Sequence, residues 1–152
     1  ESLAKIDFQE YLRSLTNYLF VSYGAVGRGI RSRITVKDVS LDVDTTIPCA
    51  LIINELVSNS LKHAFPAPGQ AKDTNEIRIS VLPDSGGRYV LTVSDNGVGL
   101  PEDFDMQNSK SLGLKLVDAL VRQLNGSIHI GSDGGAEFTI SFEAKKEGDE
   151  HA

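Results

Sequence analysis

Polar residues that could do chemistry recur at steps of three and four along one segment of the chain: Glu55, Asn59, Lys62 and His63. On a helix this spacing brings their side chains onto one face. The same segment supplies an apolar stripe for a core, formed by Ile53, Leu56, Val57, Leu61 and Ala64. A carboxylate one turn before a carboxamide, on a helix fixed by such a stripe, can provide a general base and a ligand for a metal ion. The alternative is a polar face that only keeps the helix soluble.

A carboxylate followed by spaced glycines forms a second candidate site, Asp95-Asn96-Gly97-Val98-Gly99. Asp95 follows directly on an expected strand, where a rigidly held carboxylate can accept a hydrogen bond from the exocyclic amine of adenine. Guanine would present a carbonyl oxygen at that point, and the two acceptors would repel each other. Gly97 and Gly99 let the backbone turn tightly and approach the base. The alternative is an ordinary Asp-Asn-Gly turn.

The third candidate is Ser111-Leu112-Gly113-Leu114, where a long loop enters the last expected helix. Unpaired amides at a helix N-terminus bind phosphate without any basic cluster. Gly113 keeps the first turn open to a close ligand, and Lys110 can add a point charge. The alternative is an ordinary serine-capped helix.

The elements that must position these residues begin with a helix and two strands. Asp7 is expected to cap the helix, with Glu10 at the third position reaching back, and Gly24 is expected to end it. Two stretches of alternating apolar residues then predict a pair of strands, the first containing Ile34 and Val36, the second containing Val39, Leu41 and Val43.

The central helix carries Glu55 and Asn59. Pro48 suits its first turn, so we expect the helix to begin there, with Thr46 or a neighbour as the cap. Pro66 is expected to stop it after Phe65.

Apolar alternation predicts further strands around residues 77–81 and 90–93, and a final hairpin over residues 128–142. Between them, helical spacing predicts a last helix over residues 112–124, closed by Gly126. The expected fold class is α/β, a two-layer sandwich of one mixed, mostly antiparallel sheet with helices on one face.

Composition narrows the possible functions. The chain has 152 residues and a net charge of −6, with no basic cluster, which argues against a nucleic-acid partner. We expect one domain over residues 1–143 and a disordered charged tail over residues 144–152. Cys49 is the single cysteine, and neither a signal peptide nor a membrane span is visible. We expect a cytoplasmic piece of a longer protein, without membrane contact of its own, whose parent could be membrane-anchored.

Together, in this order and spacing, the three stretches and the glycine-rich turn at 134–138 resemble the ATP-binding domain of sensor histidine kinases, in the superfamily that includes DNA gyrase and MutL. Residues 47–56 (IPCALIINEL) and 62–66 (KHAFP) resemble in particular the second class of histidine kinases. The likeness runs from Asp7 to Phe142. It implies the Bergerat ATP-binding fold and a protein histidine kinase that uses ATP and Mg²⁺.

The resemblance implies roles around the phosphates. Asn59 would give a side-chain oxygen to Mg²⁺, which bridges the phosphates. Glu55 would be the base or the orienter of the attacking group, and Lys62 and His63 would lie near the phosphates. For His63 the alternative is a helix-end residue that bonds a backbone carbonyl.

It also implies roles around the base and a lid. Asp95 would read adenine, with Gly97 and Gly99 beneath it. The segment from Leu100 to Lys110 would be a mobile lid ordered by ATP, since it is acidic and poor in apolar residues. The start of the last helix would close over the phosphates with it, through Ser111, Leu112 and Gly113.

Two departures from the family pattern stand out. Ala136 occupies a position where the superfamily usually has threonine, so a hydroxyl near the nucleotide is missing, worth about 1 kcal/mol of affinity. The family's phosphoacceptor histidine sits on a separate helical hairpin that this chain lacks, and neither His129 nor His151 resembles it. The hairpin of the same kinase and a downstream response regulator are therefore the expected partners.

Other functions on the same fold remain open. An ATP-gated conformational module like gyrase would need a second domain, which this chain is too short to contain. A serine kinase of the anti-sigma type would make an acid-stable product, whereas phosphohistidine is acid-labile. A degenerate scaffold without nucleotide binding is disfavoured by intact Glu55, Asn59 and Asp95, although Ala136 keeps it open.

Overall fold

The computed structural model describes residues 7–66, 74–106 and 111–143. Along these residues it contains three helices and five strands, in the order α1 Phe8–Ser22, β1 Ile30–Val36, α2 Val43–His63, β2 Asn75–Pro83, β3 Tyr89–Asp95, α3 Leu112–Gln123, β4 Ser127–Gly131 and β5 Glu137–Phe142. The expected tail at 144–152 and residues 107–110 of the expected lid lie outside the described residues.

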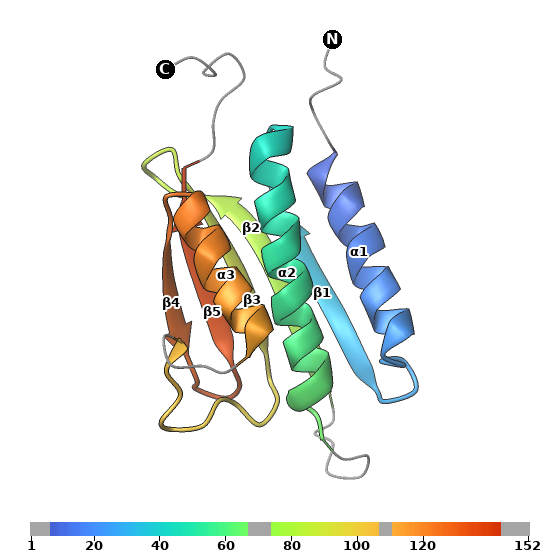
Figure 1. Ribbon diagram of the computed structural model, residues 1–152. Coiled ribbons are helices and arrows are strands. Elements are labelled where there is room, and N and C mark those ends of the chain that lie inside the picture. Colours follow the sequence, from blue (N-terminus) through green and yellow to red (C-terminus); the bar gives the residue numbers. More distant parts are fainter. Residues whose placement is uncertain (1–6, 67–73, 107–110, 144–152) are drawn as a thin grey trace.

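The strands form one sheet in the order β1-β2-β3-β5-β4. β1 pairs with β2 in parallel, and the other neighbours pair antiparallel. The helices lie side by side on one face of this sheet, with α2 between α1 and α3 (Figure 1). The predicted two-layer α/β sandwich with a mixed, mostly antiparallel sheet is therefore confirmed.

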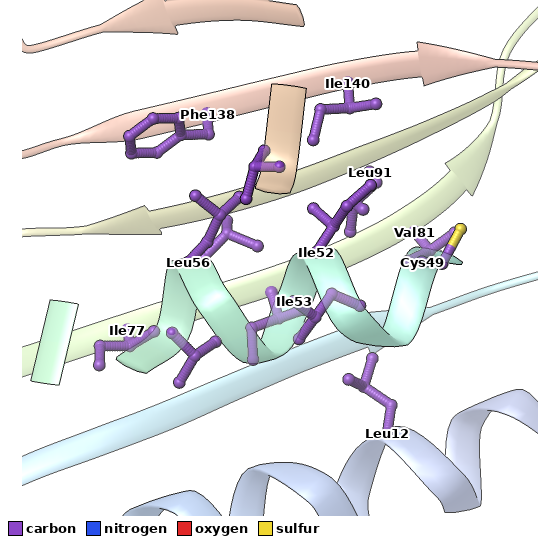
Figure 2. Close-up of a cluster of buried hydrophobic side chains, with 14 of the residues drawn as sticks. Leu12, Cys49, Ile52, Ile53, Leu56, Ile77, Val81, Leu91, Phe138 and Ile140 are labelled. Carbon is purple, nitrogen blue, oxygen red and sulfur yellow. The ribbon is translucent and has the colours of Figure 1, made fainter. Parts of the chain in front are cut away.

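The core lies between the sheet and the helices. Ile79 of β2 is opposite Val93 of β3, which is opposite Phe138 of β5, and all three side chains are buried. Figure 2 shows Ile52 and Leu56 of α2 directed at these strands. Each fully buried side chain of this kind contributes about 1.5–3 kcal/mol to stability. Because α2 packs on both neighbouring helices and on the sheet, its polar face has a fixed position.

The side-chain cap predicted for α1 is present, and so is the serine cap of α3, which was the alternative to a phosphate-binding helix start. Asp7 accepts a hydrogen bond from the Glu10 amide at 3.1 Å, and α1 ends before Gly24, whose φ is +62°. Ser111 accepts one from the Leu114 amide at 3.3 Å at the start of α3.

The predicted second strand of the N-terminal pair is wrong. Residues 37–42 form no strand, and Val43 is the first residue of α2. Leu41 of the connecting segment is nevertheless buried, and Val39 packs against the core. The period-two alternation therefore reflected a buried connection and the start of a helix.

The predicted start of α2 is also wrong. The helix begins more than one turn before Pro48, because the Asp42 side chain accepts from the Thr45 amide at 2.9 Å and caps it there. Pro48 lies inside the helix, where it has no N–H for the carbonyl of Asp44. Pro48 is buried against the core, and this packing offsets the lost backbone hydrogen bond.

Candidate functional site

A cavity of about 420 Å³ lies where the C-terminal end of α2, the end of β3 and the start of α3 meet. This volume suits a small-molecule ligand. Five of the residues predicted for a site line it, namely Asn59, His63, Asp95, Gly99 and Ser111. The other five do not line it but adjoin these in the same elements or loops, namely Glu55, Lys62, Gly97, Leu112 and Gly113.

Asp95 is the most constrained polar group of the cavity. Its side chain is buried, with one oxygen, Oδ1, accepting from the amides of Gly97 at 2.9 Å and Ala136 at 3.2 Å. The other oxygen, Oδ2, accepts from the hydroxyl of Ser60 at 2.8 Å. No Lys, Arg or His among the described residues forms an ion pair with it. The carboxylate is thus held in one orientation by hydrogen-bond donors and remains able to accept one more bond from a ligand.

The loop after Asp95 is pressed against the end of α2. A Cβ atom on Gly97 would overlap the carbonyl oxygen of Ala64, and the Val98 amide donates to that same oxygen at 2.9 Å. Gly99 has a φ of +82°, which a residue with a side chain rarely adopts. The two glycines therefore let this loop run directly under the cavity.

The start of α3 presents backbone amides beside the cavity. The first backbone hydrogen bond of the helix runs from Lys115 to the carbonyl of Ser111 at 3.1 Å, and the Ser111 side chain caps Leu114. The amides of Leu112 and Gly113 precede these bonds, in the positions that an anion can occupy at a helix N-terminus.

Glu55 and Asn59 lie one turn apart on α2, and both are half-buried. Asn59 lines the cavity, whereas the carboxylate of Glu55 is next to Gly113 in the first turn of α3. A Cβ atom on Gly113 would overlap the carboxylate of Glu55, so the glycine leaves the space that this carboxylate occupies. Asn54 donates to the other carboxylate oxygen at 3.4 Å.

Lys62 and His63 at the end of α2 are both exposed. The structure brings His63 to the cavity wall but leaves Lys62 off it. Lys110, the other expected cation, lies outside the described residues.

Sequence reasoning missed part of the cavity wall. Ser60 directly follows Asn59, and its hydroxyl bonds a carboxylate distant in sequence. Phe104 and Phe138 form another part, with ring centroids 6.5 Å apart at 87°. The apolar residues around the predicted motifs could have indicated that the cavity has an apolar wall. The contact between Ser60 and Asp95 could be recognised only from the tertiary structure.

Two findings bear on cofactors and membranes. Within residues 7–66, 74–106 and 111–143, no group of three or more His, Cys, Asp or Glu side chains could hold a metal ion. No helix in that part of the chain is long and apolar enough to cross a bilayer.

Comparison with known proteins agrees with this geometry. Residues 45–146 match the family described as histidine kinase-, DNA gyrase B-, and HSP90-like ATPase. Blue-light-activated histidine kinase 2 of Erythrobacter litoralis is 34% identical over 109 residues, which are 71% of this chain and 30% of that protein. Sensor histidine kinase PdtaS of Mycobacterium tuberculosis is 38% identical over 90 residues, which are 58% of this chain and 17% of that protein. The chain thus spans less than a third of these relatives.

A solved structure shares the whole architecture. The histidine kinase domain of the Erythrobacter litoralis blue-light-activated histidine kinase EL346 superposes with a TM-score of 0.80 at 25% identity, covering 95% of this chain and 70% of that one. The chain belongs to the histidine kinase-, DNA gyrase B- and HSP90-like ATPase family, and it is an ATP-binding domain of the sensor histidine kinase type.

Proposed function

We propose that this chain is the catalytic domain of a two-component sensor histidine kinase, which transfers the γ-phosphoryl group of ATP to a histidine on a separate helical hairpin. The observation that carries the proposal is the Asp95 carboxylate, fixed by three hydrogen bonds in a cavity that Asn59 and the start of α3 also border. These features suit the two ends of one nucleotide.

The base would lie against Asp95. Because Gly97, Ala136 and Ser60 donate to the carboxylate from fixed positions, it cannot turn away from an unsuitable ligand. It can accept from the exocyclic amine of adenine, and it would face the carbonyl oxygen of guanine without a donor between them. This asymmetry supports selection of ATP over GTP.

The phosphates would lie between Asn59 and the amides of Leu112 and Gly113. The amide oxygen of Asn59 is a hard donor of the kind that Mg²⁺ takes. Asn59 and the phosphates themselves would hold the ion. When bound, Mg²⁺ neutralises charge on the phosphate oxygens. His63 on the cavity wall would offer a ring nitrogen at the same end, and Lys62 beside it would add positive charge.

Glu55 would act on the phosphoacceptor. In the transfer, a nitrogen of the acceptor imidazole bonds the γ-phosphorus while the bond to the bridging β–γ oxygen breaks. The other imidazole nitrogen carries a proton, which a carboxylate at the position of Glu55 can bind and orient. The Glu55 carboxylate is next to Gly113 in the first turn of α3, whose amides would bind the phosphates, and this position supports the role.

The partners follow from this chemistry. The acceptor would be the histidine-bearing hairpin of the same kinase, and a response regulator would receive the phosphoryl group afterwards. Because the domain uses ATP, we place it on the cytoplasmic side of the cell. An ATP-gated conformational module and an anti-sigma-type serine kinase are less well supported, since the two relatives compared above are both named histidine kinases.

Calorimetric titration of ATP, ADP and GTP into the wild type and Asp95→Asn tests the nucleotide assignment. We expect ATP to bind at least tenfold more tightly than GTP, and Asp95→Asn to lose most of that affinity. Equal affinity for the two triphosphates, or an unaffected Asp95→Asn variant, would contradict the assignment.

Incubation with γ-labelled ATP tests the transfer. The chain alone should remain unlabelled, because His63, His129 and His151 lack an acceptor context, and acid-labile label should appear only on an added phosphoacceptor hairpin. Asn59→Ala should abolish the Mg²⁺-dependent transfer while the fold is retained. Acid-stable label would instead favour the serine kinase.

A further inference from the structure

Ser60 is a cavity residue that the proposed function uses only to hold Asp95, and its hydroxyl oxygen has no part there in contacting the ligand. It lies on α2 directly after Asn59, it is only 8% exposed, and it lines the cavity beside Asp95. Serines inside helices commonly donate to the carbonyl one turn earlier. The hydroxyl of Ser60 instead bonds Asp95 Oδ2 at 2.8 Å, across the cavity wall and between elements far apart in sequence.

The direction of this hydrogen bond determines what Ser60 can offer a ligand. An ionised carboxylate only accepts, so the hydroxyl hydrogen of Ser60 points to Asp95. The lone pairs of the hydroxyl oxygen are then the part left for the cavity. Asp95 and Ser60 together form an edge that accepts hydrogen bonds and donates none.

This edge matches an amino group and opposes a carbonyl. The 6-amino group of adenine carries two hydrogens, and both can be received by such an edge. The 6-oxo group of guanine needs a donor, which Ser60 could supply only by turning its hydrogen away from Asp95. That would break a hydrogen bond to a charged group, which is among the stronger kinds.

Ala136, another residue that lines the cavity, offers no hydroxyl in place of that of Ser60. Ala136 is 8% exposed, lines the same cavity and donates its backbone amide to Asp95 Oδ1 at 3.2 Å. Its side chain is a methyl group, so the residue directly before β5 holds the carboxylate only through its main chain. The hydroxyl at this carboxylate therefore comes from α2.

We propose that Ser60 is a specificity-determining residue, whose hydroxyl locks Asp95 and completes an acceptor-only edge for the 6-amino group of the purine. The inference rests on the proposed function and adds to it the residue that separates amino from oxo purines. It also accounts for nucleotide selectivity in a chain with alanine at position 136.

The test is calorimetric titration of three nucleotides: ATP, GTP and the 5′-triphosphate of purine riboside, which lacks the 6-amino group. In Ser60→Ala, ATP should bind about tenfold more weakly, while the affinity for the deaminated analogue changes less than about twofold. The preference for ATP over each of the other two nucleotides should therefore fall. Ser60→Cys, close in size but a poor hydrogen-bond donor, should show the same loss of preference.

Ser58→Ala is the matched control. Ser58 lies on the same helix, is equally buried at 8% and does not line the cavity. Its replacement should leave all three affinities unchanged, and thermal melting should verify that each variant is folded. A structural role alone would weaken ATP and the deaminated analogue equally, and that result would overturn the inference, as would unchanged affinities.

Asp95→Asn separates this inference from the proposed function. If Asp95→Asn leaves ATP binding intact, the assignment of Asp95 to adenine is wrong. If Asp95→Asn weakens ATP binding while Ser60→Ala preserves the ratio between ATP and the deaminated analogue, only the role of Ser60 is wrong.

Discussion

At the scale of single residues, the contact between Gly113 and Glu55 joins the two helices that flank the cavity. The carboxylate of Glu55 lies where a Cβ atom of residue 113 would be, so the position of the carboxylate depends on the missing side chain. The overlapping atom is the end of a flexible side chain and not a piece of backbone. A methyl group there would displace Glu55 and leave the packing of the helices largely unchanged.

Gly113→Ala should therefore reduce phosphoryl transfer more than nucleotide binding. With the histidine-bearing hairpin supplied in trans, we expect the transfer rate to fall at least tenfold, because the carboxylate is moved from its working position. ATP affinity should change by less than about threefold, and the free energy of unfolding by about 1 kcal/mol or less. Transfer assays, calorimetry and urea denaturation measure the three quantities.

Gly131→Ala is the control for this substitution, because a Cβ atom there has nothing within 4 Å and the residue lies on β4. It should leave transfer and binding unchanged. A Gly113→Ala protein with normal transfer would show that Glu55 can act from a displaced position.

Single residues also show the reach of sequence reasoning. Asn59 and Asp95 could be selected as candidates from the sequence because they lie in short motifs with fixed spacing. Asp95 does lie in a cavity that Asn59 also lines. The Ser60 contact could not be found in this way, because it joins two residues 35 positions apart and a serine beside Asn59 looks like any helix-face polar residue. Only the packing of α2 against the sheet defines that pair.

At the scale of elements, α2 is the helix that packs on both other helices and on the sheet. Cys49 lies in its first half, completely buried, and burial raises the pKa of the thiol to about 12. In the unfolded chain the thiol would ionise near its ordinary value of 9.0. Between these values the unfolded chain binds fewer protons than the folded one, so stability must fall as pH rises.

The free energy of unfolding should thus lose up to about 1.4 kcal/mol per pH unit to this thiol between pH 9 and 12. Urea denaturation at several pH values should show a shallower alkaline decline in Cys49→Ala than in the wild type. Below pH 8 the two curves should run parallel, offset by the cavity that the substitution creates. Identical alkaline slopes would mean that the thiol remains protonated in the unfolded chain as well.

The loop after β3 is a second element with a testable role. Leu100, Pro101 and Phe104 line the cavity, and the Leu100 amide donates to the Ser132 hydroxyl at 2.8 Å. Phe104 packs edge-on against Phe138 of β5, so its ring fixes this wall. The described part of the expected lid, residues 100–106, is thus attached to the body of the domain by side-chain contacts.

Phe104→Ala should loosen that wall and weaken ATP binding by about three- to tenfold, because an apolar surface against the base is lost. Hydrogen exchange should show faster amides over residues 100–106 in the free variant, with protection partly restored by MgATP. Val98→Ala is the control, since Val98 is exposed and does not line the cavity. Unchanged exchange in Phe104→Ala would mean that the ring does not hold the loop.

The errors in predicting elements have one physical origin. The alternation of Val39, Leu41 and Val43 resembles a strand, but burial of a connecting segment produces the same pattern. Pro48 resembles a helix start, but Asp42 caps the helix earlier and the core compensates for an internal proline. Local signals decide an element only where tertiary packing does not favour another outcome.

At the scale of the whole molecule, nucleotide binding should be visible as stability. A ligand at about 100 times its dissociation constant adds about 2.7 kcal/mol to the free energy of unfolding. For a domain of this length we expect MgATP to raise the melting temperature by roughly 5–10 °C. GTP should raise it much less, and Asp95→Asn should show no such shift. Equal shifts for ATP and GTP in a calorimetric scan would contradict adenine recognition.

The pairing of β3 with β5 sets the distance between the C-terminal end of β5 and Asp95. Phe142 at the end of β5 pairs with Tyr89, whereas Asp95 is at the opposite end of β3, about 20 Å away. The start of α1 lies at the same end of the molecule as the C-terminal end of β5 (Figure 1). A segment joined to either point is attached at the end of the domain opposite the cavity that we propose for the nucleotide. If the phosphoacceptor is linked there, we expect the length and stiffness of the junction to determine how often it meets the γ-phosphate at the other end.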